Sequence, residues 1–249
     1  IATPSRLFLY PYASTYLNQQ EYYNADLTIN RQQTSSYNGG MDIKFGLNDA
    51  FTLDATLIPD FGQTVSDNLI LNLTPFEVQF QENRQFFTEG TELYSKAGLF
   101  YSRRIGGNPI FANEVYGQLQ SDERVVENPI ETQLINATKI SGRTNGGLGI
   151  GFFNAVTAEQ TALIEDEEGN RREIMTSPLT NYNVLVLDQN LKNNSFFSLV
   201  NTNVLRAGHS YDANVLGTEF QLRDKKNKYA IGGSGAYNKK LHYEGKDDE

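Results

Sequence analysis

Segments of about ten residues in which apolar and polar side chains alternate fill the second half of the chain. In residues 213–223, Leu216, Phe220 and Leu222 fall on one face of an extended strand, while glycine and polar residues fall on the other. A period of two is that of a β-strand with one buried face. Polar turns separate these segments, and an Asn-Gly pair at Asn145 is a hairpin signal. We predict strands over residues 135–143, 147–157, 181–190, 195–205, 213–223 and 228–238.

The first half of the chain repeats this pattern. Met41, Ile43, Phe45 and Leu47 share one face of a run, and Pro59 ends the next run because proline cannot donate to a strand ladder. Short turns between successive strands favour an antiparallel meander, so the predicted fold class is all-β. The predicted strands here cover residues 6–14, 22–30, 41–47, 51–58 and 99–106, which brings the total to about eleven.

The strand lengths allow two architectures. About ten residues suit a tilted strand that crosses a membrane, whereas five or six are usual in soluble sheets. In a transmembrane barrel the apolar face of each strand would contact lipid, and the face with polar or very small residues would line a wet lumen. A soluble β-sandwich fits the alternation almost as well, so periodicity alone does not separate the two.

Residues 59–98 interrupt the meander. The sequence Thr-Pro-Phe-Glu that starts at Thr74 forms a capping box with proline at the first helical position, which predicts a short helix over about residues 75–86. Phe76 and Phe80 would lie on one helical face, although their spacing also fits a strand. Such a helix either plugs a barrel or caps the core at one end of a sheet.

A second interruption, residues 158–180, carries a charged run from Glu165 to Glu173. We interpret it as a solvated loop between strands. Carboxylates and amides crowd one turn of this run, so a calcium site is the alternative, but the spacing differs from that of an EF-hand loop.

Composition excludes several classes of function. The 249 residues include 30 Asp and Glu, 21 Lys and Arg, two His and no Cys. The lack of cysteine excludes a disulfide scaffold, an iron–sulfur centre and a thiolate zinc site. The excess of acidic residues argues against a nucleic-acid partner. No apolar run reaches the roughly 18 residues of a membrane-spanning helix, although the strands of a barrel never make such a run. We predict no cofactor and no metal site.

Five segments carry a family resemblance. They are residues 40–47, residues 53–62 with a terminal Pro-Asp-Phe-Gly, residues 71–77 with Thr-Pro-Phe-Glu, residues 82–90 with Glu-Asn-Arg-Gln-Phe-Phe, and residues 99–106. Together they resemble the DUF5916 family of Bacteroidota and related bacteria. Proteins of that family look like a carbohydrate-binding domain of the family-9 type followed by a large C-terminal β-barrel region.

The resemblance implies an outer-membrane β-barrel in a Gram-negative bacterium, with the lipid bilayer as a partner. We expect residues 1–249 to form one region of a longer barrel, because the predicted strand number is odd and the charged tail lacks a closing aromatic strand. The expected role is non-enzymatic: a channel, transport component or scaffold linked to carbohydrate uptake, with glycans or other outer-membrane proteins as partners. The alternative is a soluble all-β protein that binds carbohydrate or accompanies a glycoside hydrolase.

Charged residues of the inserted segment and of residues 99–106 are the candidate site. We expect the insert to fold into the barrel and its charges to meet charges of the lumen. Adjacent arginines in a strand face opposite sides, so we expect this pair near a strand end with one arginine reaching a carboxylate of the insert; an ordinary surface ion pair is the alternative. The candidate residues are Asp60, Glu77, Glu82, Arg84, Glu89, Arg103 and Arg104.

No catalytic residue is predicted. A glycoside hydrolase needs two converging carboxylates, and the spacing of the acidic residues of the insert does not force them together. His209 and His242 are the two possible bases of a serine triad, but the chain contains no Gly-x-Ser-x-Gly elbow. The first forty residues are rich in tyrosine, including Tyr10, Tyr12 and Tyr37. An aromatic girdle at a membrane interface explains them best, and a sugar-stacking surface is the alternative.

Overall fold

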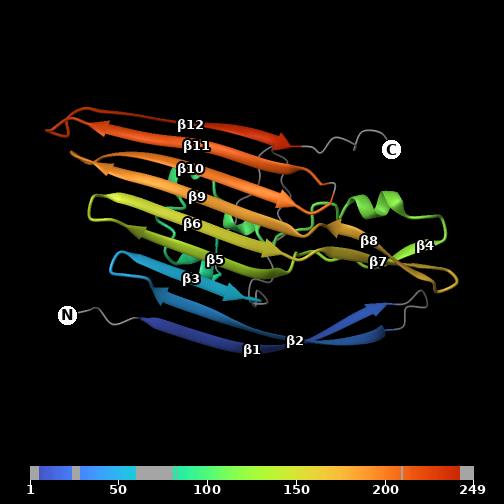
Figure 1. Ribbon diagram of the computed structural model, residues 1–249. Helices are drawn as coiled ribbons and strands as arrows, with labels where there is room; N and C mark the ends of the chain where they lie inside the picture. Colours follow the sequence, from blue (N-terminus) through green and yellow to red (C-terminus); the bar gives the residue numbers. More distant parts are fainter. Residues whose placement is uncertain (1–5, 24–28, 60–80, 83, 209, 242–249) are drawn as a thin grey trace.

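The computed structural model describes residues 6–23, 29–59, 81–82, 84–208 and 210–241. Within these ranges the chain is all-β and antiparallel, as predicted. The main sheet has the order β1 (Leu7–Tyr23), β2 (Ile29–Gly46), β3 (Phe51–Leu57), β5 (Leu134–Arg143), β6 (Leu148–Thr157), β9 (Thr180–Leu191), β10 (Ser195–Arg206), β11 (Asp212–Arg223) and β12 (Ala230–Leu241). Figure 1 shows these strands side by side in one broad sheet.

The hairpin turns of the main sheet follow from their residues. Asn193 and Asn194 both have positive φ, at 61° and 55°, as the two central residues of a primed turn require. Gly147, with φ at 82°, ends the turn between β5 and β6. The Asp224 carboxylate accepts backbone hydrogen bonds from the turn between β11 and β12, including one of 2.6 Å from Lys228. These polar turns fix the register of the long strands.

The main sheet is open in the part of the chain that the structure describes. Its two edges are β1 and β12, and each is paired on one side only. The antiparallel meander is therefore established, whereas closure into a barrel is not seen.

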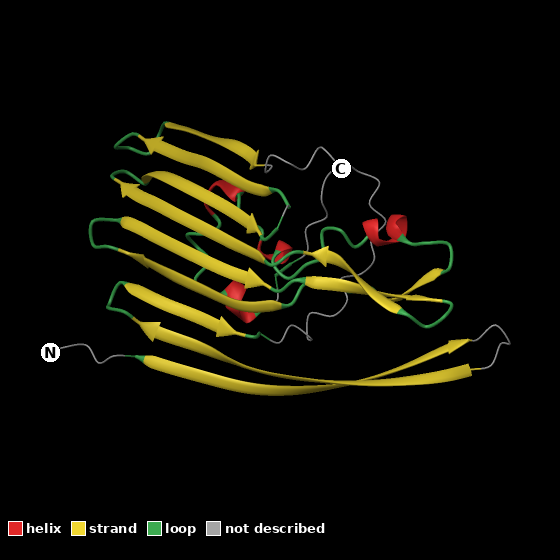
Figure 2. Cartoon of the chain, turned by 45° about the vertical axis from the view of Figure 1, so that its right-hand side comes forward, coloured by secondary structure: helices red, strands yellow, loops and turns green. Residues whose placement is uncertain are grey.

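The first hairpin projects beyond the main sheet. β1 and β2 pair continuously from Leu7 opposite Phe45 to Tyr23 opposite Ile29. β3 pairs only with the last six residues of β2, so the rest of the hairpin is a two-stranded ribbon, which extends past the other strands in Figure 2. The separate strand predicted over residues 22–30 is wrong, because the described residues of that range are the adjoining ends of β1 and β2.

A segment of turns and short helices lies between β3 and β4 (Glu123–Glu127). We call its described residues, 81–82 and 84–122, the insert. It contains α1 (Gln85–Thr88), η2 (Lys96–Gly98), η3 (Ser102–Arg104) and η4 (Glu114–Gln118). Of the predicted helix over residues 75–86, Gln85 and Phe86 are helical, as part of α1. Residues 81, 82 and 84 are not helical, so the prediction is wrong there, and its beginning lies outside the described residues. The inserted, helix-containing segment itself is confirmed where it is described.

The insert covers one face of the main sheet, which we call the inward face. Phe153 of β6, Val186 of β9 and Val200 of β10 are fully buried there against Phe87 and Tyr94 of the insert. Figure 2 shows short helices of the insert lying against the main sheet, whereas η4 lies beside a second, smaller sheet. The prediction of a wet inward face is wrong at its centre, because aromatic and aliphatic side chains fill that region.

Residues 158–180, predicted as a solvated loop, form a hairpin instead. β7 (Gln160–Asp166) pairs with β8 (Arg171–Ser177) and with β4 (Glu123–Glu127), which makes a second, three-stranded sheet. Val115 of η4 packs on this sheet, together with Ile164 and Ile174. The second sheet continues from the ends of β6 and β9, beyond one end of the main sheet in Figure 1.

Candidate functional site

A buried charged group joins the insert to the centre of the inward face. The Asp188 side chain on β9 is completely buried and accepts a 2.6 Å hydrogen bond from Ser198 Oγ. Arg143 of β5 donates to it at 2.5 Å, and the Lys96 ammonium of the insert lies 3.6 Å away. Glu219 of β11 accepts a 2.9 Å hydrogen bond from the backbone of the insert nearby. These contacts hold the insert across β5, β9, β10 and β11.

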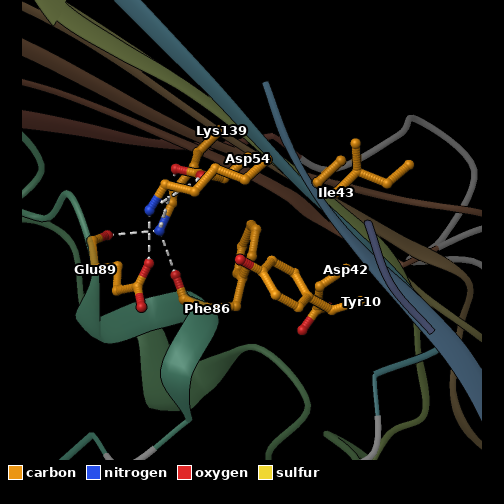
Figure 3. A pocket seen from close by; sticks show the side chains of 9 residues that line it. Tyr10, Asp42, Ile43, Asp54, Phe86, Glu89 and Lys139 are labelled. Atoms are coloured by element: carbon orange, nitrogen blue, oxygen red, sulfur yellow. Dashed lines mark hydrogen bonds and ion pairs between the residues drawn. The ribbon is translucent and has the colours of Figure 1, made fainter. Parts of the chain in front are cut away.

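A second polar group lies beside β1, β2 and β3. The Lys139 ammonium, almost fully buried, donates to the backbone carbonyls of Phe86 and Glu89 at the end of α1. Asp54 lies 3.9 Å from Lys139, and the Lys44 ammonium donates to the Glu89 carboxylate at 2.9 Å. Figure 3 shows the Lys139 side chain pointing toward Phe86 and Glu89 at the end of α1. A cavity of about 250 Å³ opens here, and its lining includes both lysines, Asp42, Asp54, Tyr10 and Phe86.

The predicted residues Glu82 and Arg84 form a pair that organises the insert. The guanidinium donates to both oxygens of the Glu82 carboxylate, at 2.8 and 2.7 Å, which is bidentate geometry. Arg84 also donates to the carbonyls of Ser102 and Ile105, and it lies 4.2 Å from the centre of the Phe87 ring. The structure therefore places Glu82 and Arg84 in one charged network, with Arg84 as the partner of Glu82.

Protonation of Glu82 is opposed by this geometry. Burial by itself would raise the pKa of the Glu82 carboxyl. The hydrogen bonds from Arg84 and Ser102 lower this pKa by more than burial raises it, so the pKa lies below its ordinary value of 4.5. A carboxyl whose pKa is lower in the folded state stabilises the fold above the unfolded pKa, and this stabilisation is lost as the pH falls through the folded pKa.

We therefore expect Glu82→Gln to remove part of the acid sensitivity of the fold. The wild type should lose stability below about pH 4.5 as Glu82 becomes protonated. The variant should be less stable than the wild type at neutral pH, and the difference should shrink toward acid pH. Urea midpoints measured between neutral pH and pH 3 test this, with the exposed Glu114→Gln as the control. A constant difference at every pH would contradict the assignment.

The remaining predicted site residues lie in different parts of the chain. Asp60 and Glu77 lie outside the described residues. Glu89 reaches Lys44, as described above. Arg103 and Arg104 lie in η3, and the Arg104 guanidinium sits 5.8 Å from the centre of the Tyr101 ring.

The strand predicted over residues 99–106, with Arg103 and Arg104 near its end, is wrong. The Ile105 amide donates to the Ser102 carbonyl, which closes a helical turn. Arg84 donates to the Ser102 and Ile105 carbonyls. A guanidinium from the same insert thus takes the place of the neighbouring strand that an extended segment would need.

Two of the tyrosines point away from the expected girdle. Tyr10 lines the inward cavity, and Tyr12 donates from its hydroxyl to the carbonyls of Leu57 and Ile58 at the end of β3. The prediction of a lipid-facing aromatic girdle is therefore wrong for these two residues. The side chains of Tyr16, Tyr22, Tyr23 and Tyr37 lie outside those that the structure describes.

The charged run of the second sheet is satisfied internally. Glu165 accepts from Arg124 at 2.6 Å and from Arg171 at 2.8 Å. Glu123 accepts from Nε and from one terminal nitrogen of Arg172, at 2.5 and 2.6 Å. The hydrogen bonds from Arg172 lower the pKa of Glu123 to about 2. Among the described residues, no group of three or more carboxylates and imidazoles is arranged to hold a metal ion. Arginines of the second sheet balance Glu123 and Glu165.

Much of the outward face of the main sheet, opposite the insert, is apolar and uncovered. Alternation places Phe152, Leu185 and Leu187 on this face, while their neighbours Phe153, Val184 and Val186 are buried inward. Other outward side chains that remain more than a third exposed include Leu57, Leu199, Leu205, Leu216, Leu222 and Ile231.

Single exposed leucines are normal on soluble proteins, but a continuous apolar face marks a contact surface.

None of the helices in the described part of the chain is both long enough and apolar enough to cross a membrane.

A family model described as a domain of unknown function (DUF5916) matches residues 3–248 of this chain. Comparison with curated proteins and with solved structures gave no match. The family match spans the main sheet, the insert and the second sheet alike.

Proposed function

This chain belongs to the DUF5916 family, and we propose that its main sheet is the wall of an outer-membrane β-barrel in a Gram-negative bacterium, with the insert seated on the lumen side. The role that we propose is non-enzymatic: a channel, transport component or scaffold. The bilayer is its main partner. A link to carbohydrate uptake, with glycans or other outer-membrane proteins as partners, follows from the family resemblance alone.

The uncovered apolar face is the observation that carries this proposal. In a soluble protein, leucine and phenylalanine side chains that share one face of a sheet are buried against another layer. Here Phe152, Leu185, Leu187 and Leu199 are 36–44% exposed in adjoining strands, while the charged groups lie on the opposite face. Lipid outside and charge inside is the arrangement of a transmembrane barrel wall.

The insert bears on which role is possible. Its aromatic residues fill the centre of the inward face, and Asp188 and Lys139 lock it there. A segment held by this much apolar contact stays in place on the sheet, which favours a scaffold or a narrow, plugged passage over a wide pore. In a plugged passage, the cavity beside Lys44 and Glu89 would be an entrance on the inward face.

We expect the protein to require detergent for extraction and to migrate differently on a gel before and after boiling. A closed β-barrel resists unfolding by cold detergent, so the unheated protein runs as a compact species. Fractionation of expressing cells and paired heated and unheated gels measure this. A compact protein that is freely soluble without detergent would instead support the soluble carbohydrate-binding alternative.

Single tryptophans test which face meets lipid, because the natural sequence contains none. We expect Leu187→Trp, on the outward face, to be strongly quenched by brominated phosphatidylcholine after reconstitution. Ser234→Trp is the matched control, since Ser234 is exposed on the inward side of β12, opposite the outward Ile231 and Tyr237. Equal quenching of both variants, or quenching of Ser234→Trp alone, would overturn the assigned orientation.

A further inference from the structure

A row of asparagines crosses the outward face of the main sheet. Asn154 of β6 lies opposite Asn183 of β9, which lies opposite Asn203 of β10, which in turn lies opposite Asn214 of β11. All four are half-exposed. We call these four residues the amide row. It separates the apolar part of this face from the ends of β6 and β9 that lead to the second sheet.

Side-chain amides bond to one another along this row and just beside it. Asn154 Nδ2 donates to Oδ1 of Asn181 at 2.7 Å and of Asn183 at 2.8 Å. Asn201 and Asn214 donate to each other, at 3.1 and 3.2 Å. Asparagine is depleted in strands, so several on one face of adjoining strands need a reason. Mutual hydrogen bonds reduce the cost of holding them where water becomes scarce.

The apolar stretch on the other side of the amide row has the height of a bilayer core. On β9 the outward residues between Asn183 and the polar turn at Lys192 are Leu185, Leu187, Gln189 and Leu191, with the one polar side chain near the turn; the span is nine residues, since 192 − 183 = 9. At about 3.3 Å per residue this is about 30 Å along the strand. A tilt of about 35–45° reduces it to about 21–25 Å, close to the apolar band of about 25 Å on transmembrane barrels.

The apolar stretch also runs obliquely across the sheet. The row of paired residues that contains Asn154 and Asn183 on β6 and β9 continues as Thr138 on β5, Ala55 on β3 and Ile43 on β2. On β2 and β3, apolar side chains thus occupy positions that asparagines occupy on β6 to β11. A bilayer boundary that crosses tilted strands produces this shift, because residues in one row then lie at different depths.

We propose that the main sheet leaves the hydrocarbon core where the amide row begins, at β6 and β9, and that the boundary crosses this row obliquely, so that it lies progressively further from the second sheet on β10 and β11. Lipid headgroups then contact the amide row, and the second sheet lies outside the bilayer. This inference rests on the proposed function. It adds the position of the membrane on the outward face and the direction in which the strands tilt. Glycerol-level carbonyls and phosphates of the lipid supply acceptors, and water supplies donors, for the amide groups that their neighbours do not satisfy.

Two leucines provide a matched test. Leu57 on β3 and Leu205 on β10 lie in one row, through Asn136, Val156 and Asn181. Their exposures are nearly equal, at 43% and 44%. Four strand steps of about 4.8 Å separate them, so a tilt of about 35–45° places Leu57 about 11–14 Å deeper than Leu205. Without tilt the two residues would lie at the same depth.

The experiment reconstitutes Leu57→Trp and Leu205→Trp in phosphatidylcholine brominated either near the headgroup or near the methyl end of the acyl chain. We expect Leu57→Trp to be quenched more by the deep bromines and Leu205→Trp more by the shallow ones. Equal depths, or a deeper Leu205→Trp, would overturn the inference. Met41→Trp and Val156→Trp, in the same row, form a second pair in case a variant fails to fold.

The two proposals fail in different ways. If Leu187→Trp is quenched by deep bromines but the row variants are not ordered as expected, the barrel wall stands and the boundary along the amide row is wrong. If none of these outward tryptophans is quenched by any brominated lipid, the membrane assignment itself is wrong.

Discussion

Replacement of Phe153 by alanine is expected to lower the free energy of unfolding by about 3–5 kcal/mol, as for other buried phenylalanines. The side chain is 2% exposed. Its ring centre lies 5.1 Å from that of Phe100, 6.0 Å from that of Phe87 and 6.2 Å from that of Tyr94. Removing the ring leaves a cavity under the insert, and these neighbours belong to a segment of turns that cannot collapse far without breaking its contacts with the sheet.

The neighbouring residue is the control. Phe152→Ala changes the same side chain on the same strand, but Phe152 faces outward and is 40% exposed. We expect it to cost much less than Phe153→Ala. Urea unfolding in the detergent that keeps the protein folded measures both, and limited proteolysis shows whether the insert becomes accessible in Phe153→Ala alone. Equal losses of stability in the two variants would contradict the assignment of the inward face.

Asp188→Ala is expected to be about as damaging, by another cause. The carboxylate is fully buried and meets Arg143, Lys96 and Ser198. Removing one partner of a buried ion pair typically costs about 3–5 kcal/mol, because the remaining charge is left without compensation. Here the alanine variant leaves both a guanidinium and an ammonium at the junction with the insert, so the insert should loosen at η2 first.

Glu92→Gln provides the comparison for Asp188→Ala. Glu92 also approaches Arg143, at 3.4 Å, but its side chain is 79% exposed. Exposed pairs contribute little, about 0–1 kcal/mol. Urea midpoints, together with protease sensitivity around Lys96, distinguish the two variants. A small effect of Asp188→Ala would mean that the insert is held by its aromatic contacts alone.

The strands of the main sheet were predictable because their signals are local. In residues 213–223 the alternation of apolar and polar side chains is visible within the segment itself. The Asn-Gly pair at Asn145 likewise indicates a turn without reference to any other part of the chain. The hairpin over residues 158–180 was missed because its charges suggested a loop. Glu165 tolerates a strand position there because Arg124 and Arg171 lie beside it in the folded sheet. Such pairing depends on which strands meet, and a single segment does not contain that information.

The candidate site was predictable only in part, for a related reason. Glu82 and Arg84 are two positions apart and could be grouped from the sequence. Asp188 and Lys96 are far apart along the chain, and the useful signal was subtler: Asp188 is an ionisable residue on a face otherwise made of valines, Val184 and Val186. A buried acid in that position needs a basic partner from elsewhere.

The glycines of β6 are a sequence signal for the packing of the insert on this strand. Gly149 and Gly151 face inward, where Leu93 and Tyr94 of the insert occupy the space that side chains would fill. Glycine weakens a strand, so a run that alternates glycine with Leu148 and Ile150 is costly unless something needs the room. The structure supplies the reason for this pattern, because side chains of the insert fill the space beside both glycines.

The alternation of strand direction in the main sheet determines whether a closed wall has an odd or an even number of strands. Every pairing between its neighbouring described strands is antiparallel, and nine strands have eight such pairings, so β1 and β12 run in the same direction. Joining these two edges directly would create a parallel seam. A wall that is antiparallel throughout therefore needs an odd number of further strands between them, which makes the total even, the rule in bacterial single-chain barrels.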